Sequence, residues 1–336
     1  MSTAKPVVAI NHAHDAVDRF FTPEDLERLA GVAEIRILGD EKDPIGDRLH
    51  DVDILMGSWG MRKLDEELLA AAPKLRAVCY AAGSVKNFAL PPAFARSVVI
   101  TSAWMANAVP VAEVSVALIT LANKDWFACQ DTIRRVAGPD GYREARSRSH
   151  AGNFGTAVGL IGFGAIGREV AKRLEALDLD VLVYDPYLTA EKIAGYQVSM
   201  VSSLTEIAER CNVVSLHAPN IPETEGMLDA TFFTAMRDNA TFINTARGKL
   251  VVEDALVAEL QTGRISAMLD VTFPEPPAAD HPFYTLPNCY LTPHRAGSSA
   301  GEVRRMGRYA IDDCLAILAG EEPKYRVHEH MLATMA

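Results

Sequence analysis

Residues 157–177 read AVGLIGFGAIGREVAKRLEAL, and this stretch decides the fold that the sequence predicts. An apolar run comes first, Gly162, Gly164 and Gly167 then form a GxGxxG pattern, and a helical pattern follows. The first glycine allows a tight turn, the second lets a pyrophosphate approach the backbone, and the third permits close packing of helix on strand. The helix N-terminus would present free N–H groups to the phosphates. The turn residues expected at a bound dinucleotide are Gly162, Phe163, Gly164, Ala165, Ile166 and Gly167.

An acidic residue follows at the distance that a dinucleotide site needs. The next apolar run ends in Asp185, 18 positions beyond Gly167 (185 − 167). A carboxylate there accepts hydrogen bonds from the adenosine ribose hydroxyls and would repel a 2′-phosphate. No arginine follows in "YDPYL", so the sequence favours NAD over NADP.

The composition excludes several classes of partner. The chain has 336 residues, enough for two domains, with 49% hydrophobic and 23% charged residues. A net charge of −11 argues against binding to nucleic acid or an anionic membrane, which would need a basic face. No apolar run approaches the length of a membrane span, and the N-terminus lacks the pattern of a signal peptide. Five scattered cysteines indicate a reduced, cytoplasmic setting.

Short β-branched runs alternate with helical patterns along both halves, which predicts an α/β protein with two doubly wound parallel-sheet domains. A long apolar helix, with Pro110 in its first turn, is expected at 109–125, and a polar excursion at 126–155. Helices are also expected at 23–32, 64–72, 203–210, 253–263 and 299–319. The expected strands are 7–10, 33–38, 52–57, 75–81 and 98–101, and then 157–161, 181–185, 213–217, 241–244, 265–270 and 289–293.

Four blocks, in order and with matching spacing, resemble the D-isomer-specific 2-hydroxyacid dehydrogenases. They are VGLIGFGAIG (158–167), CNVVSLHAPNIPETEGMLD (211–229), ATFINTARGKLVVEDALVAEL (240–260) and AMLDVTFPEPPAADHPFYTLPNCYLTPHRAG (267–297). The resemblance covers roughly residues 105–300. It implies a Rossmann cofactor domain at 107–295, inserted into a flavodoxin-like substrate domain made of 1–106 and 296–336.

The resemblance also implies a catalytic trio. Arg247 would hold the carboxylate of a 2-oxo acid, since a guanidinium stays charged and can bond two oxygens at once. His294 would give a proton to the carbonyl oxygen during reduction and take it back during oxidation. Glu275 would pair with His294, fixing its orientation and favouring its charged form.

Further positions carry over from the family as cofactor contacts. Asp270 would contact the nicotinamide carboxamide, and His217 and Pro219 would lie beside the adenosine. Asn107 would be a polar group on the cofactor side or the substrate side. The full set beyond the glycine-rich turn is Asp185, His217, Pro219, Thr224, Ala246, Asp270 and Asn107.

Substrate contacts are expected from the first half of the chain. The backbone N–H groups of Ser84 and Val85 would hold the substrate carboxylate. Trp59 and Trp104, near strand ends, would favour a 2-oxo acid with an apolar or bulky tail, although ordinary core tryptophans fit the pattern equally. Lys86 and Arg295 depart from the family pattern, which leaves the surroundings of the reacting end open.

Two alternatives to a D-2-hydroxyacid dehydrogenase stay open. The C-terminal-binding-protein corepressors share this fold and the catalytic residues, so a dinucleotide-sensing interaction protein is one of them. An enzyme like phosphoglycerate dehydrogenase is the other, whereas a formate dehydrogenase would carry glutamine where Glu275 stands. The excursion at 126–155 resembles the family's dimerisation arm and predicts a homodimer. Hydride transfer needs no metal, and no metal site is expected.

Overall fold

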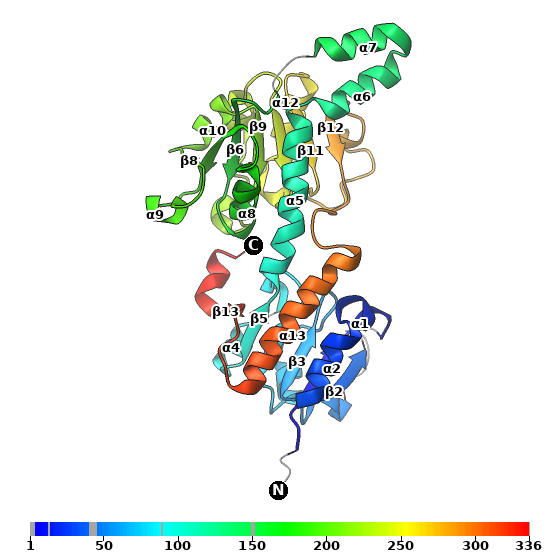
Figure 1. The fold of residues 1–336 in the computed structure, drawn as a ribbon, viewed down its shortest axis with the longest axis vertical. Coiled ribbons are helices and arrows are strands. Elements are labelled where there is room, and N and C mark those ends of the chain that lie inside the picture. Colours follow the sequence, from blue (N-terminus) through cyan, green and yellow to red (C-terminus); the bar gives the residue numbers. More distant parts are fainter. Residues whose placement is uncertain (1–3, 13, 40–45, 89, 149–151, 336) are drawn as a thin grey trace. The chain divides into compact units, whose positions relative to one another are not determined.

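The computed structural model describes residues 4–12, 14–39, 46–88, 90–148 and 152–335. They form two compact units, Met1–Asn107 with Ser298–Met335, and Ala108–Gly297. Residues 149–151, in the polar excursion, lie outside the described residues. Each unit has its own sheet, in which neighbouring strands pair in parallel except at one edge of the first sheet. The predicted α/β class with two doubly wound sheets is confirmed (Figure 1).

The first unit has a six-stranded sheet in the order β13-β5-β4-β3-β1-β2. Its strands are β1 Val7–Asn11, β2 Glu34–Gly39, β3 Ile54–Gly57, β4 Ala77–Tyr80, β5 Val99–Ser102 and β13 Arg326–Val327. Its helices are α1 His14–Phe20, α2 Pro23–Val32, α3 Glu66–Ala71, α4 Pro91–Ala95 and α13 Val303–Ala319. The edge strand β13 pairs antiparallel with β5, so this sheet is mixed where an entirely parallel one was expected.

The second unit has a seven-stranded sheet in the order β12-β11-β10-β9-β6-β7-β8. Its strands are β6 Thr156–Ile161, β7 Leu179–Tyr184, β8 Ser199–Met200, β9 Val213–Leu216, β10 Thr241–Asn244, β11 Ser266–Leu269 and β12 Cys289–Leu291. Its further helices are α8 Ala165–Leu174, α9 Ala190–Ile193, α10 Leu204–Arg210, α11 Ala230–Ala235 and α12 Glu253–Gln261.

Successive strand residues of this second sheet enter two different cores. In β10, Phe242 packs into the cluster under α10–α12, while Ile243 packs into the cluster under α8 and α5 (Trp104–Ala122). The same alternation separates Leu182 from Val183 in β7. Strands buried on both faces have nearly continuous apolar sequences, which is why the runs in this half are so apolar.

Helix α5 (Trp104–Ala122) differs from its prediction in two ways. It begins five residues earlier than expected, so Pro110 lies inside the helix and not in its first turn. It is also long and apolar enough, by length and composition, to cross a membrane, which contradicts the expectation that no run approaches that length. This is the one such helix among the described residues, and 44% of the stretch is buried within the protein. The core helix of a soluble protein passes the same test, so the finding is weak evidence for a membrane.

The polar excursion is helical over most of its described residues. It contains α6 (Trp126–Arg135) and α7 (Gly138–Ser147), which pack on each other beyond the end of α5 (Figure 1). A Cβ atom at Gly141 would lie 1.5 Å from the Val136 carbonyl oxygen, so the close approach of the two helices requires glycine there.

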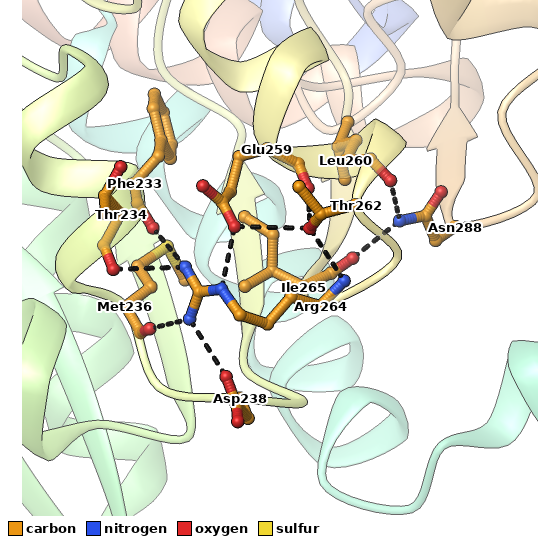
Figure 2. A network of polar contacts seen from close by, with 10 residues as sticks. All are labelled: Phe233, Thr234, Met236, Asp238, Glu259, Leu260, Thr262, Arg264, Ile265 and Asn288. Carbon is orange, nitrogen blue, oxygen red and sulfur yellow. Dashed lines mark hydrogen bonds and ion pairs between the residues drawn. The ribbon is translucent and has the colours of Figure 1, made fainter.

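Arg264, just before β11, joins three segments of the second unit (Figure 2). Its guanidinium donates to the carbonyl oxygens of Phe233, Thr234 and Met236, at the end of α11, and its Nε donates to Glu259 of α12 at 2.8 Å. The last carbonyl groups of a helix have no partner within it. Arg264 therefore satisfies the end of α11 and fixes it beside α12.

Candidate active site

The carboxyl ends of the seven-stranded sheet gather most of the predicted groups. Because neighbouring strands are parallel, the residues that follow them lie along one edge. In the strand order of this sheet, β7 and β8 lie on one side of β6, whereas β9 to β12 lie on its other side. The strand order therefore reverses at β6. In open α/β sheets the crevice at such a reversal is where ligands bind. The predicted groups that follow these strands are Gly162, Asp185, His217, Arg247, Asp270 and His294.

The glycine-rich turn lies at that reversal. Gly162 has φ +94°, and a Cβ there would be 2.6 Å from the backbone nitrogen of Ala218. A Cβ at Gly167 would be 2.2 Å from the Gly162 carbonyl oxygen, whereas one at Gly164 would meet nothing within 4 Å. A side chain would therefore clash with neighbouring backbone at Gly162 and Gly167, whereas the space beside Gly164 is free of protein atoms. No side chain caps the N-terminus of α8, which leaves its first N–H groups for a phosphate.

Two of the other turn residues face the protein. The Phe163 side chain is buried and packs edge-to-face on Tyr196, with ring centres 5.1 Å apart, so only its backbone can meet a ligand. Ile166 packs partly against the same core.

Asp185 follows β7 directly and faces this turn. Its Oδ2 accepts the Phe163 N–H at 2.8 Å, and its Oδ1 accepts the Tyr187 N–H at 2.9 Å. Each carboxylate oxygen keeps a further lone pair, so the residue can still accept from ribose hydroxyls.

His217 follows β9 and is buried without a hydrogen-bond partner at either ring nitrogen. Burial lowers its pKa to about 3, so the ring is neutral at pH 7. A buried polar side chain without a partner calls for an explanation, and a ligand bound at the neighbouring turn would supply one. The open glycine, the uncapped helix, Asp185 and His217 together fit a bound dinucleotide.

Pro219 and Thr224 lie in the turn that follows. The Thr224 hydroxyl donates to the Pro219 carbonyl oxygen at 2.6 Å and accepts the Ile221 N–H at 3.1 Å. Its bonds are thus made within the turn, which gives Thr224 a structural role whether or not it also meets a cofactor.

Asp270 anchors the loop that carries His294. Its Oδ1 accepts the Thr292 hydroxyl at 2.6 Å and the Arg295 N–H at 2.7 Å, and its Oδ2 accepts the Ala296 N–H at 2.8 Å. The side chain is almost fully buried. His294 adopts φ 53°, a left-handed conformation that is uncommon outside glycine, and these bonds hold the loop in it.

His294 and Glu275 form the predicted pair. The His294 Nδ1 lies 2.8 Å from the Glu275 Oε1, and both side chains are exposed, at 47% and 41%. Because Nδ1 is bonded to the carboxylate, Nε2 is the ring nitrogen left for a substrate.

Arg247 lies in the turn after β10. The side chain of Asn244 shapes this turn, donating to the Arg247 carbonyl oxygen at 3.0 Å and accepting the Ala246 N–H at 3.0 Å. Burial lowers the pKa of Arg247, and the charge of Glu275 acts in the opposite direction. The group stays a cation at any working pH. One guanidinium nitrogen donates to the Ala246 carbonyl oxygen at 2.6 Å, which leaves further N–H donors for an anion.

The remaining predicted residues belong to the first unit. Val85 has a fully buried side chain, so only its backbone could meet a ligand. Trp104 packs edge-to-face on Tyr325, with ring centres 6.0 Å apart, which favours the core interpretation left open for it. Trp59 is 45% exposed and packs on Phe20. The Ser84 hydroxyl accepts the Lys86 N–H at 3.4 Å.

Asn107 ends the first segment of the same unit. Its Oδ1 accepts the Ser298 N–H at 2.9 Å, which ties the two segments of the unit together. Within the described residues, no group of three or more His, Cys, Asp or Glu side chains could hold a metal ion.

A family model described as "D-isomer specific 2-hydroxyacid dehydrogenase, NAD binding domain" matches residues 117–296. The chain belongs to the D-isomer specific 2-hydroxyacid dehydrogenase family. The resemblance seen in the four sequence blocks is thereby confirmed.

Curated members of this family include two informative relatives. D-3-phosphoglycerate dehydrogenase of Methanocaldococcus jannaschii is 29% identical over 295 residues, which cover 87% of this chain and 55% of that protein. The chain thus spans about half the length of that relative. (S)-sulfolactate dehydrogenase of Chromohalobacter salexigens is 32% identical over 252 residues, 75% of this chain and 80% of that protein.

The fold of the family is also seen in solved structures. Apo D-mandelate dehydrogenase of Rhodotorula graminis aligns with a TM-score of 0.83 at 21% identity, over 97% of this chain and 98% of that one. At this identity the likeness establishes the two-domain fold.

Sequence reasoning missed part of how the loops of the site are held, since it named neither Asn244 nor Glu253 and expected only a cofactor contact from Asp270. Asn244 shapes the turn that carries Arg247, and Asp270 holds the loop that carries His294. A polar residue ending a buried parallel strand was the available signal, and both residues carry it. Glu253, which bonds the segment carrying Glu275, gave no signal, because it resembles any acidic residue in the first turn of a helix.

Proposed function

We propose that the protein is an NAD-dependent oxidoreductase that transfers hydride between NADH and C2 of a 2-oxo acid, forming a D-2-hydroxy acid. The observation that carries the proposal is the His294–Glu275 pair, 2.8 Å apart, on the sheet edge that also holds Arg247 and the glycine-rich turn. A proton donor, an anion clamp and a dinucleotide cradle are the parts that such a reduction requires.

The side chains divide the chemistry among them. Bound NADH supplies the hydride for C2. Arg247 holds the substrate carboxylate and polarises the neighbouring carbonyl through its remaining N–H donors. His294 delivers a proton from Nε2 to the carbonyl oxygen during reduction and removes it during oxidation. Glu275 accepts a hydrogen bond from the Nδ1–H of His294, which fixes the orientation of the ring.

The choice of NAD is proposed to rest on Asp185. Its carboxylate already accepts two backbone N–H groups, which hold it in place. A 2′-phosphate beside this charge would be repelled, whereas a ribose hydroxyl would donate to it.

The remaining parts of the proposal concern the first unit and the surroundings. Ser84 and Val85 would contribute backbone N–H groups to the substrate carboxylate, and the exposed Trp59 would contact the substrate tail. We also propose a homodimer formed through α6 and α7, in the cytoplasm. All five cysteines are free, which agrees with a reducing compartment.

The test is the loss of NADH absorbance, with NADPH in parallel, across 2-oxo acids from glyoxylate and hydroxypyruvate to branched, phenyl and phosphorylated or sulfonated members. Turnover with NADH at a rate well above that with NADPH is the expected result. Tight NADH binding without turnover of any member would contradict the enzyme and favour a dinucleotide-sensing protein. Equal rates with NADH and NADPH would contradict the role of Asp185.

A further inference from the structure

Glu253 makes a direct contact with the segment that carries Glu275. It is the first residue of α12, and its Oε1 accepts the backbone N–H of Phe273 at 2.7 Å. Phe273 stands two positions before Glu275. A charged acceptor makes this one of the stronger kinds of hydrogen bond.

The turn that carries Arg247 contacts the same segment at two further points. A Cβ at Gly248 would lie 2.1 Å from the carbonyl carbon of Thr272, so the two backbones touch there. The Lys249 Nζ lies 4.6 Å from the centre of the Phe273 ring, a cation–π distance. The segment at 272–276 is therefore held from the side of residues 248–253.

Packing between this segment and residues 249–254 is incomplete. A cavity of about 310 Å³ is lined by Val252, Phe273, Pro274 and His281, together with Lys249 and Glu253. Phe273 is 54% exposed. Where apolar packing is missing, position depends on the directional contacts that remain. The hydrogen bond from Phe273 to Glu253 is the shortest of these.

Glu253 is itself held in place. Its side chain is 13% exposed, and its Oε2 lies 3.9 Å from the Nε2 of His281. The His281 Nδ1 accepts the Phe283 N–H at 3.3 Å, which orients that ring. Burial raises the pKa of Glu253, and the bond from Phe273 acts against this rise. Asp254, the next residue, is exposed.

We propose that Glu253 is a positioning residue for the reaction. Its carboxylate fixes the 272–276 segment, and through Glu275 it sets the ring of His294. The inference rests on the proposed function, and it links the start of α12 to the acid–base pair. Glu253 touches neither substrate nor cofactor in this role.

The test compares Glu253→Ala with Glu253→Gln and Asp254→Ala under saturating NADH and the best 2-oxo acid. Glu253→Ala should lower kcat about 10- to 100-fold, because small misplacements of a proton donor are costly. The KM for NADH should stay within about 2-fold. Glu253→Gln keeps an acceptor oxygen and should recover kcat to within about 3-fold of wild type. Asp254→Ala removes a carboxylate from the same helical turn and should change kcat less than about 2-fold.

A double-mutant cycle separates positioning from general damage. In a Glu275→Gln background, Glu253→Ala should lower kcat less than about 3-fold further, because the two residues act through one contact. A loss as large as in wild type would overturn the proposal, as would an Asp254→Ala enzyme as impaired as Glu253→Ala. Should Glu253→Ala fail to fold, Glu253→Asp, which withdraws the acceptor by one methylene, is expected to show the same loss.

Hydrogen exchange gives a readout that does not depend on turnover. Amide exchange in the peptide covering 272–276 should be about 10-fold faster in Glu253→Ala and unchanged in Asp254→Ala. Unchanged exchange in Glu253→Ala would overturn the inference. A wild-type protein that turns over no 2-oxo acid would instead overturn the proposed function, and that result appears before any variant is made.

Discussion

His294 combines a left-handed backbone, which is uncommon outside glycine, with an exposed ring. Asp270 holds the backbone by accepting three hydrogen bonds from residues 292–296. Glu275 holds the ring at Nδ1. Two carboxylates therefore act on one residue, one through the main chain and one through the side chain, and the free Nε2 is what remains for chemistry.

Replacing His294 by alanine should lower the rate of 2-oxo acid reduction by roughly 10²–10⁴, since general acid catalysis supplies that factor. NADH binding should stay intact, because the glycine-rich turn and Asp185 are untouched. Stopped-flow reduction rates and a fluorescence titration with NADH measure the two effects. An unchanged rate would remove His294 from the mechanism.

His217 should make stability depend on pH. Burial lowers its pKa to about 3, against 6.5 in the unfolded chain, so between these values only the unfolded state binds the proton. Stability is then complete above pH 6.5 and falls as pH falls. Between pH 6.5 and 5 the loss is about 2 kcal/mol.

The matched variant is His217→Gln, which cannot titrate. Urea unfolding at pH 7 and pH 5 should show the wild-type free energy of unfolding falling by about 2 kcal/mol more than that of the variant. Parallel changes in the two proteins would mean that the ring is protonated in the folded state or paired with a group that stabilises its charge.

At the scale of elements, the second unit depends on polar side chains that satisfy helix ends. Arg264 bonds carbonyl oxygens at the end of α11 and the side chain of Glu259 on α12 (Figure 2). Its side chain is 26% exposed. Truncating it would leave several partly buried acceptors without a donor.

Arg264→Ala should lower the free energy of unfolding by about 2 kcal/mol, the typical loss for a partly buried charged hydrogen-bonding group. Calorimetry should show a Tm lower by about 4–8 °C for a unit of this size. Arg237→Ala is the matched control, because Arg237 makes one exposed bond, to the Arg210 carbonyl oxygen at 3.3 Å. Equal effects of the two substitutions would show that the network adds nothing beyond a surface charge.

At the scale of the whole molecule, the paired helices α6 and α7 present apolar surface that the described residues leave exposed. Trp126 is 59% exposed and Tyr142 is 54% exposed. The base of the pair is fixed, since Phe127 packs on Tyr290 and the Tyr290 hydroxyl donates to Asp131 at 3.1 Å. A fixed base and exposed aromatic rings are features of an interface.

We expect a homodimer in solution, and Trp126→Ser with Tyr142→Ser should shift it toward monomer. Sedimentation equilibrium at micromolar concentration measures the change. The matched control is Tyr187→Ser, which removes an equally exposed ring (60%) from the loop after β7. A wild-type protein that sediments as a monomer would contradict the proposed dimer.

The sequence by itself determined the class of fold and the family. These follow from local features: the strand–turn–helix order, three spaced glycines and Asp185. Each is set by the conformation that one short stretch of backbone has to adopt. Most strand and helix ranges were predicted within about two residues for the same reason. Pro110 was misplaced because α5 begins at Trp104, five residues before the start that the sequence pattern indicated. The two-residue edge strands β8 and β13 were missed because so short a run carries no periodicity.

Tertiary structure alone decided how the loops of the site are held. Asp270 and Thr292 are 22 residues apart, and Glu253 and Phe273 are 20 apart, yet each pair is joined by a hydrogen bond. Such contacts exist only after parallel strands bring their carboxyl ends to one edge, so no local pattern encodes them. The same holds for Trp104, whose packing on Tyr325 joins residues 221 positions apart (325 − 104).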